Sequence, residues 1–151
     1  MRVIFLDCDG VLNSQEGGFG VPEDDKIQRL KRIVDETEAV IVLSSSWRYA
    51  EGYRDSSGIR RLYDSLINHL ANYGLSLYSS TPIKGTIRGE EIDEWIMNCG
   101  EDITSFVILD DDSDMEPHMD NLVKTDYRKG LQDEEVQKAI RILKGDELKY
   151  E

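Results

Sequence analysis

Two aspartates, Asp7 and Asp9, directly follow the apolar run RVIFL near the start of the chain. Side chains alternate along an extended segment, so both carboxylates point the same way while Cys8, between them, points toward the core. An Asp-Gly pair after a strand is often only a turn, and Asp9 is followed by Gly10. The two aspartates indicate a functional site only if other chemically active residues lie at the same end of the same sheet.

A second acidic stretch, DDDSD at residues 110–114, follows another apolar run. Carboxylates that converge repel each other unless a cation lies between them. Since hard oxygen ligands without a His or Cys cluster favour Mg²⁺, we expect a magnesium site. Mg²⁺ keeps open positions for phosphate oxygens, and a carboxylate can attack phosphorus to form an acyl phosphate. These residues therefore predict Mg²⁺-dependent phosphoryl chemistry.

Short apolar runs alternate with amphipathic segments along the chain. The predicted strands are 2–6, 39–43, 75–78, 105–109 and 121–125, and the predicted helices are 22–37, 57–74, 89–100 and 133–145. This alternation requires crossover connections, which favour a parallel sheet with helices on both faces. We therefore expect an α/β fold: a single Rossmann-like domain over residues 1–151, with a mostly parallel sheet of about five strands.

Sites in such sheets lie beyond the carboxyl ends of the strands. The polar stretch SSSWR, residues 44–48, follows the second predicted strand. Two cations, Lys84 and Arg88, precede the helix that leads into the fourth strand. A hydroxyl and a cationic side chain at this edge could hold phosphate oxygens as charge builds during transfer.

The composition limits the partners and the compartment. Aspartate and glutamate number 31 against 18 lysine and arginine, a net charge of −13 that disfavours extended binding to duplex nucleic acid. No run approaches the roughly 18 apolar residues of a membrane span, and the opening MRVIFLD becomes charged too early for a signal peptide. The two cysteines lack framework spacing, so we expect a cytoplasmic protein.

Taken together, the motifs resemble those of the haloacid dehalogenase-like hydrolases. DCDGVL resembles the first motif, DxDGxL, and VIVLSSS resembles the second, a strand that ends in Ser or Thr. VILDDDSD resembles the fourth, a strand that ends in an acidic pair with another acid downstream. The order and separations match over nearly the whole chain. DGVLN, SSSWR and ILDDDSDM look closest to the small, nearly capless members grouped with Swiss-army-knife RNA-repair proteins.

The resemblance implies a role for each acidic residue. Asp7 would be the nucleophile and a Mg²⁺ ligand. Asp9 would be the general acid and base, with its backbone carbonyl on the metal. Asp111 would be the fourth-motif metal ligand with Asp110 beside it, and Asp114 would order the metal-bound waters.

Two assignments within the resemblance stay open. Either Ser45 or Ser44 would bind the transferring phosphate, and Ser45 is preferred because Trp47 follows it at the spacing that the subgroup uses. Arg88 would be the cation of the third motif, with Lys84 as the alternative. All four side chains are therefore candidates for phosphate binding.

The resemblance implies a phosphomonoester hydrolase that works through an aspartyl-phosphate, because both aspartates of DxD are present. The alternatives are phosphotransfer to an acceptor other than water and a non-catalytic module that binds a phosphorylated partner. Neither stretch between motifs is long enough for a large cap domain. We expect an open site, guarded by the Gly-rich flap at 14–20 and the loop at 48–58. It would admit a phosphate on a nucleic-acid end, a protein or a small ester.

Overall fold

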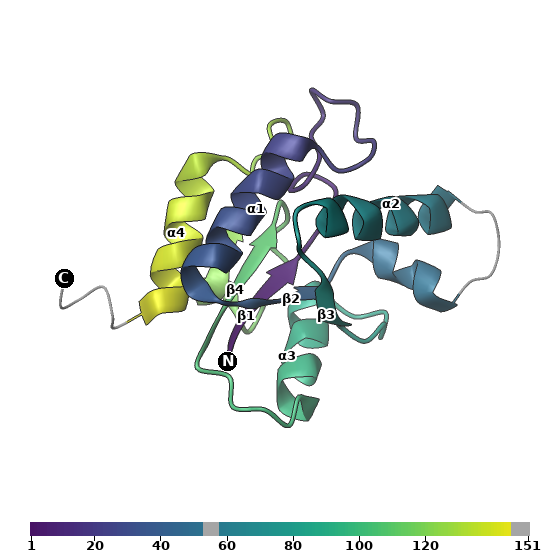
Figure 1. Ribbon diagram of the computed structural model, residues 1–151. Coiled ribbons are helices and arrows are strands. Elements are labelled where there is room, and N and C mark those ends of the chain that lie inside the picture. Colours follow the sequence, from purple (N-terminus) through teal and green to yellow (C-terminus); the bar gives the residue numbers. More distant parts are fainter. Residues whose placement is uncertain (53–57, 146–151) are drawn as a thin grey trace.

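A five-stranded parallel sheet forms the centre of the computed structural model, which describes residues 1–52 and 58–145 (Figure 1). The strands are β1 (Arg2–Leu6), β2 (Val40–Leu43), β3 (Leu77–Ser80), β4 (Ser105–Asp110) and β5 (Leu122–Lys124). Their order across the sheet is β3-β2-β1-β4-β5, and every neighbouring pair is parallel. This order confirms the predicted α/β class and makes β1 the central strand.

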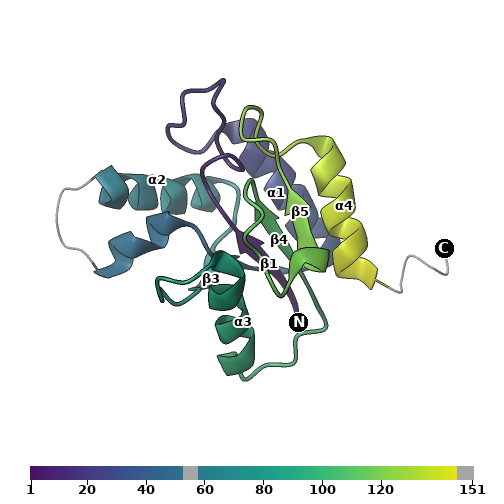
Figure 2. The same cartoon turned by 180° about the vertical axis from the view of Figure 1, so that it is seen from behind.

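Helices cover both faces of the sheet, as predicted. They are α1 (Asp24–Thr37), α2 (Gly58–Asn72), α3 (Arg88–Asn98) and α4 (Asp133–Lys144), with two short 3₁₀ helices, η1 (Ser46–Gly52) and η2 (Met119–Asn121). Helices α1, α2 and α4 contribute to the larger core on one face, and α3 packs on the other (Figures 1 and 2). Helix α3 and its N-terminus therefore lie on the opposite face of the sheet from α1, α2 and α4.

The central strand is buried on both faces because helices cover both. Ile4 and Leu6 belong to the larger core, whereas Val3 and Phe5 belong to the smaller core beneath α3. The ring of Phe5 meets that of Trp95 on α3 edge to face, with centroids 5.5 Å apart. A near-continuous apolar run is the expected sequence of such a strand.

Strand β3 begins two residues later than the predicted range of 75–78. Gly74 has a left-handed φ of 73° and ends α2, and the amide of Leu75 donates to the carbonyl of Leu70. The amide of Gly74 donates to Ala71, which completes a Schellman motif. Leu75 is buried as part of this helix cap, so the strand starts only at Leu77.

The stretch after β2 is more ordered than the loop that the sequence predicts. Residues 46–52 form η1, in which Trp47 and Ala50 are buried. Apolar side chains at these two positions bring the segment down onto the core. The rest of the predicted guard loop includes residues 53–57, which lie outside the described residues.

The carboxyl edge of the sheet carries loops rather than a second domain in the described part of the chain. A loop and α1 connect β1 to β2, and η1 and α2 connect β2 to β3. The loops that leave the carboxyl ends of β1 and β5 lie together at one end of the molecule (Figures 1 and 2). No helix among the described residues is both long and apolar enough to cross a membrane.

Candidate active site

One row of polar side chains crosses the sheet at the ends of its strands. Asp7 follows β1 and donates its amide to the carbonyl of Leu109, and Ser44 donates its amide to Leu6. These bonds continue the register in which Leu6 lies opposite Leu43 and Leu109. The next row therefore contains Ser44, Asp7 and Asp110. Because side chains alternate, this row faces the α3 side of the sheet, as Phe5 does two residues earlier.

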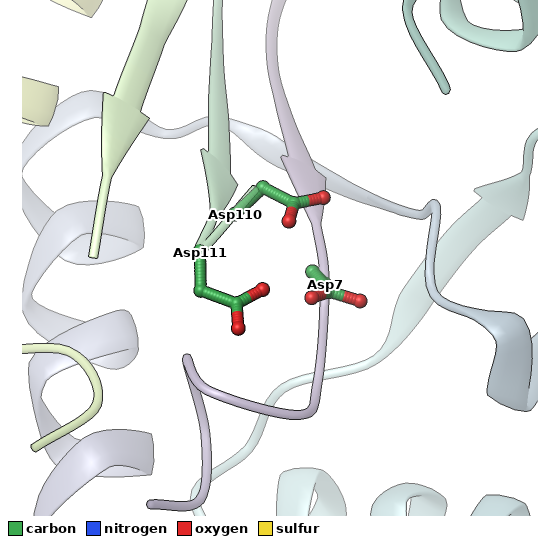
Figure 3. Close-up of side chains that lie close together, drawn as sticks. All are labelled: Asp7, Asp110 and Asp111. Carbon is green, nitrogen blue, oxygen red and sulfur yellow. The ribbon is translucent and has the colours of Figure 1, made fainter. Parts of the chain in front are cut away.

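Three carboxylates converge in this row and just beyond it. Asp7, Asp110 and Asp111 each place one oxygen within 4.8 Å of the others (Figure 3). Three hard oxygen donors without a His or Cys suit Mg²⁺, so the residues present fit the predicted metal. The turn beside them depends on Gly10, whose φ is 81° and where a Cβ would collide with the carboxylate of Asp111.

Burial and mutual repulsion disfavour the ionised form of the carboxyl groups in this cluster. Burial raises the pKa of Asp7 well above its usual value, and the nearby charge of Asp110 raises it further. Burial also raises the pKa of Asp110 to about 7. Charged Arg88 opposes both shifts, but it is one cation beside three acids. A bound divalent cation would relieve this repulsion and allow all three groups to ionise.

Asp9 lies outside the cluster, exposed in the loop that follows β1. Its Oδ1 accepts a hydrogen bond of 2.9 Å from Asn13 Nδ2, and its Oδ2 accepts one of 3.2 Å from Trp47 Nε1. Asn13 is itself fixed by the amide of Gly10, at 2.9 Å. The carboxylate is therefore oriented but remains accessible, which suits a group that exchanges protons with a substrate or water.

Trp47 is both a packing residue and a hydrogen-bond donor to Asp9, and the sequence predicted only the packing. Its side chain is 2% exposed and belongs to the larger core, as a packing residue would. Its indole nitrogen nevertheless orients Asp9. The resemblance to the subgroup implies that this tryptophan belongs to the second motif, but nothing in the sequence indicates which partner its N–H would find.

The two candidate serines lie in different environments. The Ser44 hydroxyl is buried in the row with Asp7 and has no hydrogen-bond partner in the described residues. The Ser45 hydroxyl accepts a hydrogen bond from the amide of Trp47 at 3.1 Å. Cys8 is fully buried, as predicted, and burial raises its thiol pKa. The geometry therefore favours Ser44 for phosphate binding, the reverse of the order that the spacing suggested.

The two candidate cations also separate clearly. Arg88 begins α3 and places Nη1 3.8 Å from Asp7 Oδ1, and this nitrogen is buried without a hydrogen-bond partner among the described residues. Lys84 instead places Nζ 3.0 Å from Glu94 Oε1, on the half-exposed outer side of α3. Arg88 therefore joins the site, and Lys84 does not.

Asp114 lies where the acidic loop meets α3. Its Oδ2 accepts the Arg88 amide at 3.4 Å, and its backbone carbonyl accepts the amide of Gly89 at 2.9 Å. A carboxylate at a helix N-terminus satisfies free amides and interacts well with the helix dipole. Asp114 thus connects the acidic loop after β4 to the helix that carries Arg88, a contact that the sequence did not predict.

A buried ion pair that the sequence did not reveal supports both phosphate-binding candidates. Arg48 Nη2 lies 2.8 Å from Glu91 Oε1, with both side chains at most 5% exposed. The Arg48 guanidinium also donates to four carbonyls that follow β2 and β3: Ser44 at 3.0 Å, Ser45 at 2.8 Å, Thr81 at 3.1 Å and Pro82 at 3.4 Å. This pair links the ends of two strands to the first turn of α3. The sequence contains both charges but no signal that pairs them.

The parallel sheet and the acids at the ends of β1 and β4 are the features of a haloacid dehalogenase-like domain, a class of phosphatase-type hydrolases. The family model for the HAD domain in Swiss Army Knife RNA repair proteins matches residues 3–136, so the chain belongs to that family. This match confirms the resemblance in the motifs. No curated protein and no solved structure gave a significant match.

Proposed function

We propose that this protein is a Mg²⁺-dependent phosphomonoester hydrolase that works through a phosphoaspartate on Asp7. The observation that supports it best is the pair of environments around this one buried carboxylate. On one side lie the acids Asp110 and Asp111, which suit a cation. On the other lies Arg88, whose Nη1 is 3.8 Å from Asp7 Oδ1 and has no hydrogen-bond partner among the described residues, which suits a phosphate oxygen. The remaining Asp7 oxygen is available to attack phosphorus.

Asp7, Asp110 and Asp111 would hold the metal. When bound, Mg²⁺ would supply positive charge that offsets the three carboxylates and the incoming phosphate. The metal also explains how a carboxyl group with a raised pKa can act as an ionised nucleophile at neutral pH.

The protein's own residues would carry two chemical steps. In the first, an Asp7 oxygen attacks phosphorus, the ester P–O bond breaks, and Asp9 gives its proton to the departing alcohol. In the second, Asp9 takes a proton from water, whose oxygen attacks the phosphorus of phospho-Asp7. The P–O bond to Asp7 then breaks, which frees phosphate and restores the carboxylate. Ser44 and Arg88 hold the non-bridging oxygens in both steps.

The substrate that we propose is a phosphate at the end of a nucleic-acid strand, in the cytoplasm. The name of the family associates its members with RNA repair. In the described part of the chain, loops rather than a second domain lie at the carboxyl edge of the sheet (Figures 1 and 2), which is compatible with a large substrate. A strand end requires only local contacts, which are compatible with a net charge of −13.

Turnover of an aryl phosphate tests the chemistry. Wild-type protein should release phosphate with Mg²⁺ and stop in excess chelator. Asp7→Asn should fall to background, and intact mass should detect a phosphoenzyme in the wild type or in Asp9→Asn. Full activity in chelator, or in Asp7→Asn, would reject the site.

The products separate hydrolysis from its alternatives. Hydrolysis releases one phosphate for each alcohol, whereas a phosphotransferase leaves part of the phosphate on an added acceptor. A non-catalytic module would bind phosphoesters without turning them over. The accessible Asp9 carboxylate favours an enzyme, because a module that only binds has no need of a proton donor beside the phosphate.

A further inference from the structure

A pocket of about 450 Å³ opens beside the carboxylate cluster of Asp7, Asp110 and Asp111, and the two proposed chemical steps do not use it. Its lining residues are Asp111, Lys124, Thr125, Asp126 and Tyr127. Asp111 belongs to the carboxylate cluster, so the pocket begins at the reacting centre. Tyr127 gives the same pocket an aromatic ring. The volume is within the usual range for small-molecule sites.

The ring of Tyr127 is one half of an exposed aromatic pair. It stacks on Phe19 with centroids 6.4 Å apart and an angle of 24° between the planes. The two rings come from different loops, which are joined by backbone hydrogen bonds: Gln15 donates to the carbonyl of Tyr127 at 3.0 Å, and Glu16 donates to Arg128 at 3.3 Å. These loops lie together at the carboxyl end of the sheet (Figures 1 and 2).

The pair is not explained by packing. Phe19 is 40% exposed and Tyr127 is 47% exposed, so a large part of both rings faces water. The backbone of Phe19 has a φ of 51°, a left-handed conformation that is unfavourable for a bulky side chain. The flap therefore holds an aromatic ring at the surface against its backbone preference, next to a second ring that lines the pocket.

Cations accompany the rings although the chain is acidic overall. Lys124 lines the pocket, is exposed, and forms no ion pair with any described residue. Lys129, in the turn that carries Tyr127, is likewise exposed, and its charge interacts with that of Asp126. Exposed cations beside exposed rings are the combination that binds the backbone and bases of single-stranded nucleic acids.

We propose that Phe19 and Tyr127 form a stacking platform for the base of a nucleotide whose phosphate lies at Asp7. This inference rests on the proposed function and specifies its leaving group. The pocket that Asp111 and Tyr127 share would hold the sugar of this nucleotide, between its base and its phosphate. In phosphotyrosine the ring carries the phosphate directly, so it would leave the platform empty.

The kinetic test compares substrates with and without a base. Wild-type protein should have a KM for nucleoside monophosphates about tenfold below that for ribose 5-phosphate, and Tyr127→Ala should remove most of this ratio. Tyr127→Phe keeps the ring and should preserve the ratio. The matched control is Tyr78→Ala, which removes an equally exposed ring, 51%, from β3. A Tyr127→Ala variant that keeps the full ratio would overturn the platform.

A binding test decides the platform independently of turnover. Titration calorimetry on Asp7→Asn should show weaker binding of a nucleoside monophosphate once Tyr127→Ala is added. If the substrate is the end of a nucleic-acid strand, a 3′- or 5′-phosphorylated oligonucleotide should bind more tightly than the mononucleotide. This gain in affinity should decrease as the salt concentration rises. Equal affinity for ribose 5-phosphate and the nucleotide, or preference for a phosphotyrosine peptide, would overturn the inference. If wild-type protein binds nucleotides in this way but hydrolyses no ester, the proposed function fails and the platform stands.

Discussion

Ser44 and Ser45 are neighbours in sequence but face opposite sides of the sheet. This follows from the alternation of an extended chain, which places Ser44 in the row of Asp7 and Ser45 beside Cys8. The unpaired hydroxyl of Ser44 is costly to bury unless a ligand satisfies it. The side chain that looks unsatisfied in the free protein is therefore the better candidate for ligand binding.

The two serines give a matched pair of variants. Ser44→Ala should lower kcat by about 10²-fold, because one donor to the transferring phosphate is lost. Ser45→Ala should leave kcat within a few-fold and lower the free energy of unfolding by about 1 kcal/mol, because it removes a buried hydrogen bond. Steady-state kinetics and urea unfolding on both variants measure these effects. The reverse pattern would assign phosphate binding to Ser45 instead.

Asp9 gives a second prediction, which depends on the leaving group. Asp9→Asn removes the proton donor and base but leaves Asp7 in place. Turnover of an alkyl phosphate should fall by about 10²- to 10⁴-fold, and turnover of an aryl phosphate should fall less, because an aryl alcohol departs with less protonation. Parallel rate measurements on the two esters test this. Equal losses on both esters would argue that Asp9 does not protonate the leaving group.

At the scale of elements, the sequence predicts the positions of those site residues that directly follow a strand. The apolar runs located β1, β2 and β4, and parallel pairing alone brings Asp7 and Asp110 into one row. Arg88 could be placed only near the site, because its approach depends on how α3 packs. The Arg48–Glu91 pair could not be predicted, because it joins segments 43 residues apart through a buried contact without a periodic signal.

The Arg48–Glu91 pair should position the phosphate site as well as stabilise it. Arg48→Met removes the closer of the two cations that pair with buried Glu91 and leaves it only Arg88, whose Nε lies 3.8 Å from Oε1, so we expect the free energy of unfolding to fall by about 3 kcal/mol. The double variant Arg48→Met/Glu91→Leu should recover part of this stability but not kcat, since the ends of β2 and β3 lose their link to α3. Denaturant unfolding and kinetics well below the melting temperature separate the two effects.

The control for this pair is the surface ion pair of the same helix. Lys84→Met breaks the contact with Glu94, where both side chains are substantially exposed, so stability should change by about 1 kcal/mol or less. Turnover should stay close to that of the wild type, because Lys84 lies outside the carboxylate cluster. A double variant of Arg48 and Glu91 that recovers full kcat would show that the buried pair has no positioning function.

At the scale of the whole molecule, the acid cluster makes stability depend on pH and metal together. Folding raises the pKa of Asp110 from 3.8 to about 7, so between these values the folded state binds more protons than the unfolded chain. Its contribution to stability is therefore present at pH 4 and lost as the pH rises through 7. In chelator, the melting temperature should fall over this range, and less so in Asp110→Asn.

Mg²⁺ should reverse this trend. Because the cation binds the ionised carboxylates of the folded state, its stabilising effect should be larger at pH 8 than at pH 5. Thermal unfolding at both pH values, with and without Mg²⁺, measures the difference. A Mg²⁺ effect that is equal at both pH values would argue against binding at Asp7, Asp110 and Asp111.

The central place of β1 has a consequence for how activity is lost. Its amides pair with neighbouring strands on both sides, so they can exchange with solvent only when the sheet itself opens. The loops that carry Phe19 and Tyr127 can open while the sheet stays closed. Hydrogen exchange should therefore be slowest at Phe5 and Leu6 and much faster in the flap. Warming should therefore first weaken binding at the proposed platform of Phe19 and Tyr127, whereas Asp7, the proposed nucleophile, should keep its position until the last cooperative unit of the domain unfolds.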